Sequence, residues 1–103
     1  MTMRRGTTPT FEVDCDVDLT GYTIFLTLEQ GTNEITLTPD CETTQTGCTL
    51  SVTLTQEQTL SFRGDMKASM QIRAVDQSGL AIASNIMTVD IGRILLEGVI
   101  DYA

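Results

Sequence analysis

One stretch of the chain, residues 48–62, changes its periodicity halfway along, and this change constrains the fold more than any other feature. In the first half, Cys48, Leu50, Val52 and Leu54 alternate with polar residues. Side chains along a strand point to opposite faces with a period of two, so this half predicts a β-strand buried on one side. The second half breaks the alternation and predicts a short helix.

The helical half begins with the residue pattern of a capping box. Thr55 is a suitable N-cap, and Gln58 stands three residues later, where its side chain can bond back to the Thr55 backbone. Leu60 and Phe62 follow, on one or two helical turns. We therefore expect a strand that runs directly into a capped helical turn.

Alternation of apolar and polar residues predicts further strands on both sides of this stretch. They are residues 10–17 (Phe11, Val13, Cys15 and Val17 inward), 22–29 (Tyr22, Ile24, Leu26 and Leu28 buried), 34–38 (Ile35 and Leu37 opposite the preceding strand), 67–76 (Ala68, Met70, Ile72 and Ala74 on one face) and 80–91. Turns are expected at residues 19–21, 30–33, 39–40 and 77–79, where glycine, asparagine, aspartate or proline interrupts the pattern. Residues 42–47 read as a polar loop, and Ser84 and Asn85 suggest a bulge in the last strand.

Six to seven short strands, turns about every ten residues and one short helical turn predict an all-β fold. The architecture that fits is an antiparallel β-sandwich of the immunoglobulin-like kind. A chain of 103 residues corresponds to one domain, so residues 1–103 are predicted to form a single β-sandwich domain. The cysteine and tryptophan pattern of antibody domains is absent because the chain has no tryptophan. The pattern leaves the strand order open.

The two ends of the chain differ from the middle. Residues 1–6 form a short basic lead-in, which we expect to be loose or docked along a sheet edge. Residues 92–103 carry five large apolar residues around Gly98. Such a segment either covers the core of its own molecule or docks on a neighbour, and the sequence leaves both alternatives open.

The charge balance excludes two classes of partner. Fourteen acidic residues against six basic ones give a net charge of −8. Proteins that bind nucleic acid gain affinity by neutralising phosphates with lysine and arginine, and anionic membranes also attract basic surfaces, so we expect neither partner. Arg4 and Arg5 are not followed by the apolar run of a signal peptide, and no run of about 18 apolar residues occurs. We therefore expect synthesis and folding in the cytoplasm, unless another protein exports the chain.

The three cysteines, Cys15, Cys41 and Cys48, do not form a secreted disulfide framework, because their number is odd and their spacing irregular. A bridge between Cys41 and Cys48 across a hairpin is geometrically open. We favour three free thiols in a reducing compartment. A zinc site is not predicted, because histidine is absent and no two cysteines stand two to four residues apart.

Asp14, Asp16 and Asp18 resemble the start of a calcium-binding loop. The EF-hand loop requires glycine at its sixth position and glutamate at its twelfth, and Leu19 and Phe25 stand there instead. We interpret the three aspartates as the solvent-facing side of a strand and its end.

Residues 63–65 spell Arg-Gly-Asp, the tripeptide that integrins recognise. Three residues recur by chance, and Gly-Asp after a helical turn is ordinary chemistry for the end of a helix. We interpret this tripeptide as a turn.

The chain lacks the usual parts of a catalytic site. A serine or cysteine nucleophile needs a base, histidine is absent, and Lys67 is the only lysine. No glycine-rich phosphate loop appears, and few aromatic residues are available to stack on sugars. We predict no enzymatic activity, no catalytic, cofactor-binding or metal-binding residues and no cofactor. Open sheet edges and the apolar end remain as surfaces for partners.

Three segments carry a resemblance to a known family: residues 5–10 (RGTTPT), 50–59 (LSVTLTQEQT) and 83–89 (ASNIMTV). In these segments the chain resembles small phage and prophage structural proteins encoded among the tail genes of viruses of Gram-positive bacteria. It is also similar to the N-terminal β-sandwich of phage baseplate upper proteins. The resemblance spans nearly the whole chain, and its motifs are strand and turn residues.

The resemblance implies a non-catalytic virion component of the tail or baseplate, a structural or adaptor module. It would bind other phage structural proteins, and it could form a homo-oligomer through its sheet edges or through residues 92–103. The alternative is an immunoglobulin-like surface or adhesion module of a bacterium, which would require a signal peptide or flanking domains. A small hydrolase would require a basic group in a cleft.

Overall fold

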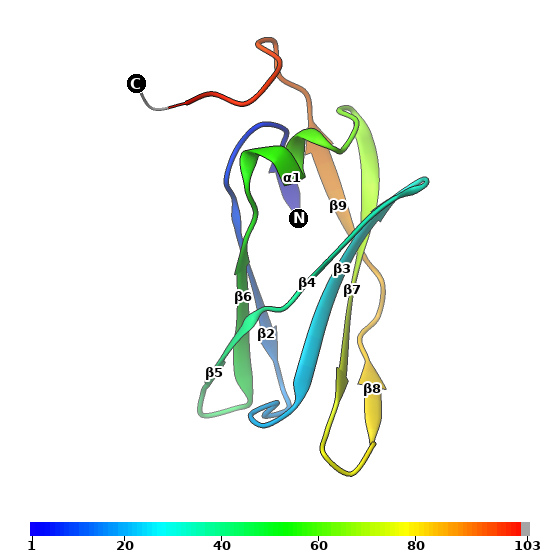
Figure 1. Cartoon of the computed structure of the whole chain (residues 1–103). Coiled ribbons are helices and arrows are strands. Elements are labelled where there is room, and N and C mark those ends of the chain that lie inside the picture. Colours follow the sequence, from blue (N-terminus) through cyan, green and yellow to red (C-terminus); the bar gives the residue numbers. More distant parts are fainter. Residues whose placement is uncertain (102–103) are drawn as a thin grey trace.

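In the computed structural model, which describes residues 1–101, two β-sheets pack face to face (Figure 1). The six-stranded sheet has the order β1-β9-β7-β3-β4, with β8 also paired to β7, and the three-stranded sheet has the order β2-β6-β5. The strands are β1 Thr2–Arg4, β2 Thr10–Cys15, β3 Thr23–Gln30, β4 Asn33–Leu37, β5 Asp40–Thr43, β6 Cys48–Thr53, β7 Met66–Val75, β8 Ala81–Ala83 and β9 Met87–Gly92, and the helix is α1 Gln56–Leu60. The predicted all-β sandwich with one short helical turn is confirmed. The immunoglobulin-like topology stays a prediction.

The larger sheet is built on β7, its longest strand. On one side β7 pairs along most of its length with β3, and Met70 lies opposite Leu28. On the other side, the first half of β7 pairs with β9 and the second half with β8. β8 and β9 therefore lie end to end along the same strand, and β8 forms the edge of the sheet at one end of the molecule.

The core lies between the two sheets, and it follows the predicted alternation. The buried apolar residues are Met3, Phe11, Leu19, Ile24, Leu26, Leu28, Cys48, Leu50, Leu54, Phe62, Ala68, Met70, Ile72, Ala74, Val89 and Ile91. Burial of apolar side chains contributes about 1.5–3 kcal/mol each for the larger ones, so this layer is the main source of stability.

Helix α1 closes one end of the sandwich, and the predicted capping box is confirmed. Thr55 Oγ1 accepts a hydrogen bond from the Gln58 backbone N–H at 3.1 Å, and Gln58 Oε1 accepts one from the Thr55 N–H at 2.8 Å. Inside the helix the Thr59 hydroxyl is buried and donates to the Thr7 carbonyl at 2.9 Å. Phe62, just beyond the helix, fills the core beneath it.

Two predictions about the strands are wrong in detail. Residues 1–101 form nine strands where six to seven were expected, and one pair, β1 with β9, is parallel. Residues 42–47 are not all loop, because Glu42 and Thr43 belong to β5. Pro39 does end a strand as predicted, but β5 begins at the next residue, on the opposite sheet.

The expected last strand, residues 80–91, consists of two strands. The alternation breaks at Ser84 and Asn85 as predicted, but the break separates β8 from β9 and is not a bulge. Ser84 is fixed at the break, because its backbone N–H donates to the Ile72 carbonyl at 2.8 Å. Its hydroxyl also accepts a hydrogen bond from the Ile72 N–H at 3.0 Å.

The end of the first predicted strand is also corrected. β2 stops at Cys15, so Val17 is 50% exposed and not inward as expected. Leu19, expected only as part of a turn, is 4% exposed and enters the core. The turn itself is confirmed by a hydrogen bond from the Tyr22 N–H to the Leu19 carbonyl at 3.0 Å.

The basic lead-in is docked along a sheet edge, one of its two expected positions. Residues 2–4 pair in parallel with the end of β9, and Met3 is buried. The Arg5 backbone N–H continues this pairing with a hydrogen bond to the Gly92 carbonyl at 3.0 Å.

Candidate interaction surfaces

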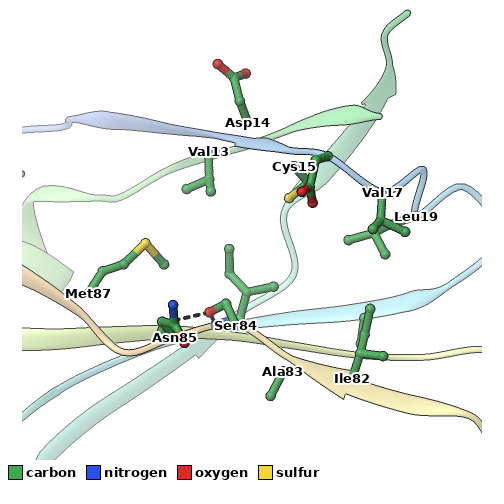
Figure 2. A pocket seen from close by; sticks show the side chains of 13 residues that line it. Val13, Asp14, Cys15, Val17, Leu19, Ile82, Ala83, Ser84, Asn85 and Met87 are labelled. Carbon is green, nitrogen blue, oxygen red and sulfur yellow. Dashed lines mark hydrogen bonds between the residues drawn. The ribbon is translucent and has the colours of Figure 1, made fainter. Parts of the chain in front are cut away.

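An apolar groove lies on one side of the sandwich, between β2 and the segment that contains β8. Its volume is about 620 Å³, within the range of about 300–1,000 Å³ typical of ligand sites. Figure 2 shows β2 and the residues after it on one wall and residues 82–87 on the other. The groove is lined by Val13, Asp14, Cys15, Asp16, Val17, Leu19, Ile72, Ala74, Ile82, Ala83, Ser84, Asn85 and Met87.

The groove exists because two strands are left without a partner on one side. β2 pairs only with β6, and β8 pairs only with β7. Their free edges lie on the same side of the sandwich, and Ile72 and Ala74 form the floor between them. Unpaired edges present backbone N–H and C=O groups to any chain that lies alongside.

Several polar groups of the groove already have hydrogen-bond partners. Ser84 Oγ donates to the Asn85 carbonyl at 2.9 Å, and the Gln71 side-chain amide donates to the Ser84 carbonyl at 3.0 Å. Asp14 accepts a hydrogen bond from the Thr49 hydroxyl at 2.8 Å. Within residues 1–101 no buried side-chain nitrogen or oxygen lacks a partner. The groove thus offers mainly apolar surface, with the exposed side chains of Asp16 and Asn85 among its polar positions.

The only thiol in the groove wall is that of Cys15, and its environment makes it a weak nucleophile. Burial, followed by contact with Cys48, raises the pKa of the Cys15 thiol to about 11. Because the thiolate is the reactive form, little of it is present at neutral pH. Catalysis by Cys15 is not supported.

The register of the smaller sheet decides which cysteines face each other. Cys48 lies directly opposite Cys15, whereas Cys41 lies opposite Leu50. The Cys41–Cys48 pairing considered from the sequence is thus diagonal across two strands. All three cysteines are free thiols in the structure.

The second surface is the C-terminal segment, defined here as residues 93–101; the last two residues of the predicted segment 92–103 lie outside the described part. Leu95 is 92% exposed and Leu96 is 68% exposed, and Val99 and Ile100 are also largely exposed. This segment does not cover the core with those side chains. The second alternative from the sequence, docking on a neighbour, therefore stays a prediction.

The C-terminal segment is nevertheless attached to its own molecule at several points. Arg5 Nη1 forms an ion pair with Glu97 at 2.7 Å. The Gln56 side chain donates to the Ile100 carbonyl at 2.8 Å and accepts from the Ile100 N–H at 2.7 Å. Ile94, the residue before this pair, lies next to Gly6. The segment from which Leu95 and Leu96 project is therefore held by Ile94 on one side and by Glu97 on the other.

Two of the three aspartates considered as calcium ligands form hydrogen bonds with different threonines. Asp14 bonds Thr49 across the strand pair, and Asp18 accepts hydrogen bonds from the Thr20 backbone and hydroxyl at 3.0 and 2.7 Å. These bonds lower the pKa of Asp18. No group of three or more potential metal ligands occurs among residues 1–101.

The Arg-Gly-Asp tripeptide forms a tight turn between α1 and β7. A Cβ atom on Gly64 would lie 2.7 Å from the Cα of Arg93, so only glycine fits there. Asp65 has a positive φ of 61°, and its N–H donates to the Ile91 carbonyl at 2.7 Å. The interpretation as a turn is confirmed.

Lys67, the only lysine, is exposed and pairs with Asp90 at 3.4 Å. It is not among the residues that line the groove. Lys67 is thus not placed to act as a base for a side chain that lines the groove.

Sequence reasoning missed the groove. Its signals were present as departures from pattern: Val17 and Leu19 after the end of one strand, and the Ser84–Asn85 break in another. Each of these departures from the alternation is common when it occurs alone. Only the tertiary structure brings the residues together, in the lining of one groove.

Within residues 1–101 no helix has the length and apolar character needed to cross a membrane. Among known proteins, neither a family model nor a curated protein matches the chain.

Proposed function

We propose that the protein is a non-catalytic structural or adaptor module of a phage or prophage virion, in the tail or baseplate, and that it acts through contacts with other proteins. The resemblance of residues 5–10, 50–59 and 83–89 to phage tail-region proteins provides the setting. The immunoglobulin-like sandwich belongs to this proposal. The virion is then its final location, after synthesis in the host cytoplasm.

The observation that carries the proposal is the exposure of the apolar C-terminal segment. Large apolar side chains that protrude together on a small protein mark sites of protein contact. Leu95 and Leu96 are exposed side by side, while the groove between β2 and β8 offers apolar surface with free strand edges. Both features suit assembly with neighbouring subunits.

The proposed lack of catalysis is supported by the chemistry of the cavities. The groove between β2 and β8 contains carboxylates and a thiol of raised pKa, but no histidine, lysine or arginine lines it. Histidine is the side chain that most often serves as the general acid or base of an enzyme, and the groove lacks it.

The proposal is tested on particles purified after induction of the prophage that encodes the chain. We expect the protein to co-purify with tails at a fixed ratio to the major tail protein, measured by quantitative mass spectrometry. A stop codon early in its gene should remove the protein and leave particles with defective tails. Complete, infectious particles without detectable protein would contradict the proposal, and detection on the surface of uninduced cells would favour the adhesion module.

A further inference from the structure

Cys15 and Cys48 face each other at the end of the contact between β2 and β6. They are direct partners in the antiparallel register, so their side chains point to the same face of the sheet. The Cα atoms of such partners are about 4.5 or 5.5 Å apart, depending on the local hydrogen-bond pattern. Both values lie within the range of about 4.4–6.8 Å over which a disulfide joins two cysteines. The backbone therefore admits a bridge between Cys15 and Cys48 without rearrangement.

Cys41 is a less suitable partner for Cys48. Burial first, and Cys48 next, raise the pKa of the Cys41 thiol, so Cys48 lies near both other cysteines. However, Cys41 lies opposite Leu50 and is only a diagonal neighbour of Cys48. Diagonal neighbours are about 7–8 Å apart, and beyond about 7 Å a bridge requires movement of the backbone. The register thus favours Cys15, although Cys41 is the nearer cysteine in the sequence.

The Cys48 side chain already points toward the chain that follows β2. Its Sγ donates a hydrogen bond to the Val17 carbonyl at 3.4 Å. The residue before it, Gly47, packs directly on the backbone of Cys15, because a Cβ atom at Gly47 would collide with the Cys15 carbonyl oxygen. Both contacts hold the two strands together where the two cysteines lie.

Of these two thiols, Cys15 is the one that a reagent can reach. Cys15 is partly exposed and lies in the wall of the groove between β2 and β8 (Figure 2), whereas Cys48 is only 1% exposed. The volume of the groove, about 620 Å³, is sufficient for a small organic disulfide. Because burial, followed by Cys48, raises the pKa of the Cys15 thiol to about 11, its reaction should be slow at neutral pH and faster in alkaline solution.

We propose that Cys15 and Cys48 are a site of reversible disulfide formation, which joins β2 to β6 when the protein meets a small-molecule disulfide. First the Cys15 thiolate attacks one sulfur of the reagent, so that a mixed disulfide forms at Cys15 and one thiolate leaves. Cys48 then gives its proton to solvent and attacks the Cys15 sulfur, which releases the second thiolate and completes the bridge. The two cysteines are oxidised, and the reagent is reduced to two molecules of its thiol.

The bridge is expected outside reducing compartments, since glutathione and thioredoxin keep cytoplasmic thiols reduced. A virion component, the role proposed above, leaves the host cytoplasm when the particle is released. Only this occasion for oxidation rests on the proposed function. The chemistry of the two thiols does not.

The experiment treats the whole reduced chain with 2-hydroxyethyl disulfide at about pH 9, where more of each thiol is ionised than at neutral pH. The remaining thiols are then blocked, and the chain is cleaved after glutamate without reduction. This cleavage places the three cysteines in separate peptides, residues 13–29, 35–42 and 43–57. We expect mass spectrometry to find peptide 13–29 linked to peptide 43–57 as the main product, and dithiothreitol to remove the link.

The same reaction in urea is the first control, because loop closure alone decides the pairing in an unfolded chain. Shorter loops close at a lower entropic cost, so urea should shift the main product to a link between Cys41 and Cys48. The variant Cys41→Ser is the second control, and it should form the Cys15–Cys48 bridge at the rate of the unmodified chain. The variant Cys15→Ser should lose this product.

The bridge should also stabilise the fold, because it restricts the unfolded chain between two distant residues. We expect the oxidised chain to melt at least about 4 °C above the reduced chain, with an unchanged circular-dichroism spectrum. This measurement separates a bridge that fits the native strand pair from one that forms only when the strands come apart.

Three results would overturn the proposal: no linked peptide from the folded chain, Cys41–Cys48 as its main product, or an oxidised chain that melts below the reduced one. Each result is obtained with purified protein and is independent of whether virions contain it. Absence of the protein from virions would contradict the proposed function and leave the disulfide site in place.

Discussion

The side-chain amide of Gln30 forms two reciprocal hydrogen bonds with the backbone of Arg63. Gln30 Nε2 donates to the Arg63 carbonyl at 2.9 Å, and Gln30 Oε1 accepts from the Arg63 N–H at 2.6 Å. Gln30 is only 5% exposed, so these bonds form away from water. They join the end of β3 to the turn that follows α1, and this side chain had been expected in a turn.

Substitution Gln30→Ala should lower the free energy of unfolding by about 1–3 kcal/mol, because it removes both part-buried hydrogen bonds to the Arg63 backbone. Urea denaturation measures this loss. Gln77→Ala is the control, since Gln77 is exposed in the turn after β7, and it should change stability by less than about 0.5 kcal/mol. Equal stability of the two variants would show that the Gln30 bonds contribute nothing.

The capping box offers a second test. Thr55→Ala removes the hydroxyl that accepts from the Gln58 N–H, and loss of such a cap costs about 1 kcal/mol. Thr55→Ser keeps a hydroxyl in place and should remain within a few tenths of a kcal/mol of the original. The midpoints of urea unfolding compare the two. A serine variant as unstable as the alanine variant would mean that the threonine methyl group, and not the cap, is responsible.

Asp76 should contribute stability that depends on pH. Its Oδ1 accepts hydrogen bonds from the Ser78 hydroxyl and N–H and from the Leu80 N–H, at 2.7, 2.9 and 2.9 Å. These bonds lower the pKa of Asp76 below its ordinary value of 3.8. The unfolded chain therefore takes up the proton first on acidification, so the contribution is present above about pH 4 and is lost as pH falls through the folded-state pKa.

The measurement compares the original chain with Asp76→Asn from pH 5 to pH 2, which are roughly the limits of this titration. The aspartate form should lose stability more steeply on acidification, and NMR titration should place the Asp76 carboxyl below 3.8. The pKa of Asp18 is also lowered, but Asp18 is present in both proteins. Its contribution to the acid profile therefore cancels when the two proteins are compared. Parallel acid profiles for the two proteins would rule out this role for Asp76.

The Cys15 thiol should react slowly with iodoacetamide at pH 8. Its pKa is raised to about 11 from 9.0, mainly by burial and next by Cys48, so its reaction rate should rise until about pH 11. In urea the same thiol should titrate near 9. Because the unfolded chain ionises first, the stability from this thiol is present below about pH 9 and is lost as pH rises toward 11.

Peptide mapping by mass spectrometry follows each cysteine separately during this reaction. Identical rate profiles for Cys15 in the folded and unfolded chain would show that its environment does not perturb it. Faster reaction at Cys15 than in urea at pH 8 would show the opposite perturbation.

The elements that form from neighbouring residues were predictable. Strand β7 was expected at residues 67–76 and spans residues 66–75, because each residue's neighbours two positions away share its face. The capping box of Thr55 and Gln58 was predicted because both partners lie within one helical turn. Strand β5 was missed, since only Cys41 of its four residues is partly buried and an exposed edge strand has almost no period-two signal.

By itself, then, the sequence determined which residues alternate, where the chain turns and how the helix begins. Only the tertiary structure decided that β2 and β8, from different sheets, line the same groove, and that Leu95 and Leu96 stay outside the core. The physical reason is the range of the interactions. Periodicity shows which face of a strand is buried, but the neighbour of an edge is set by contacts between residues far apart in the chain.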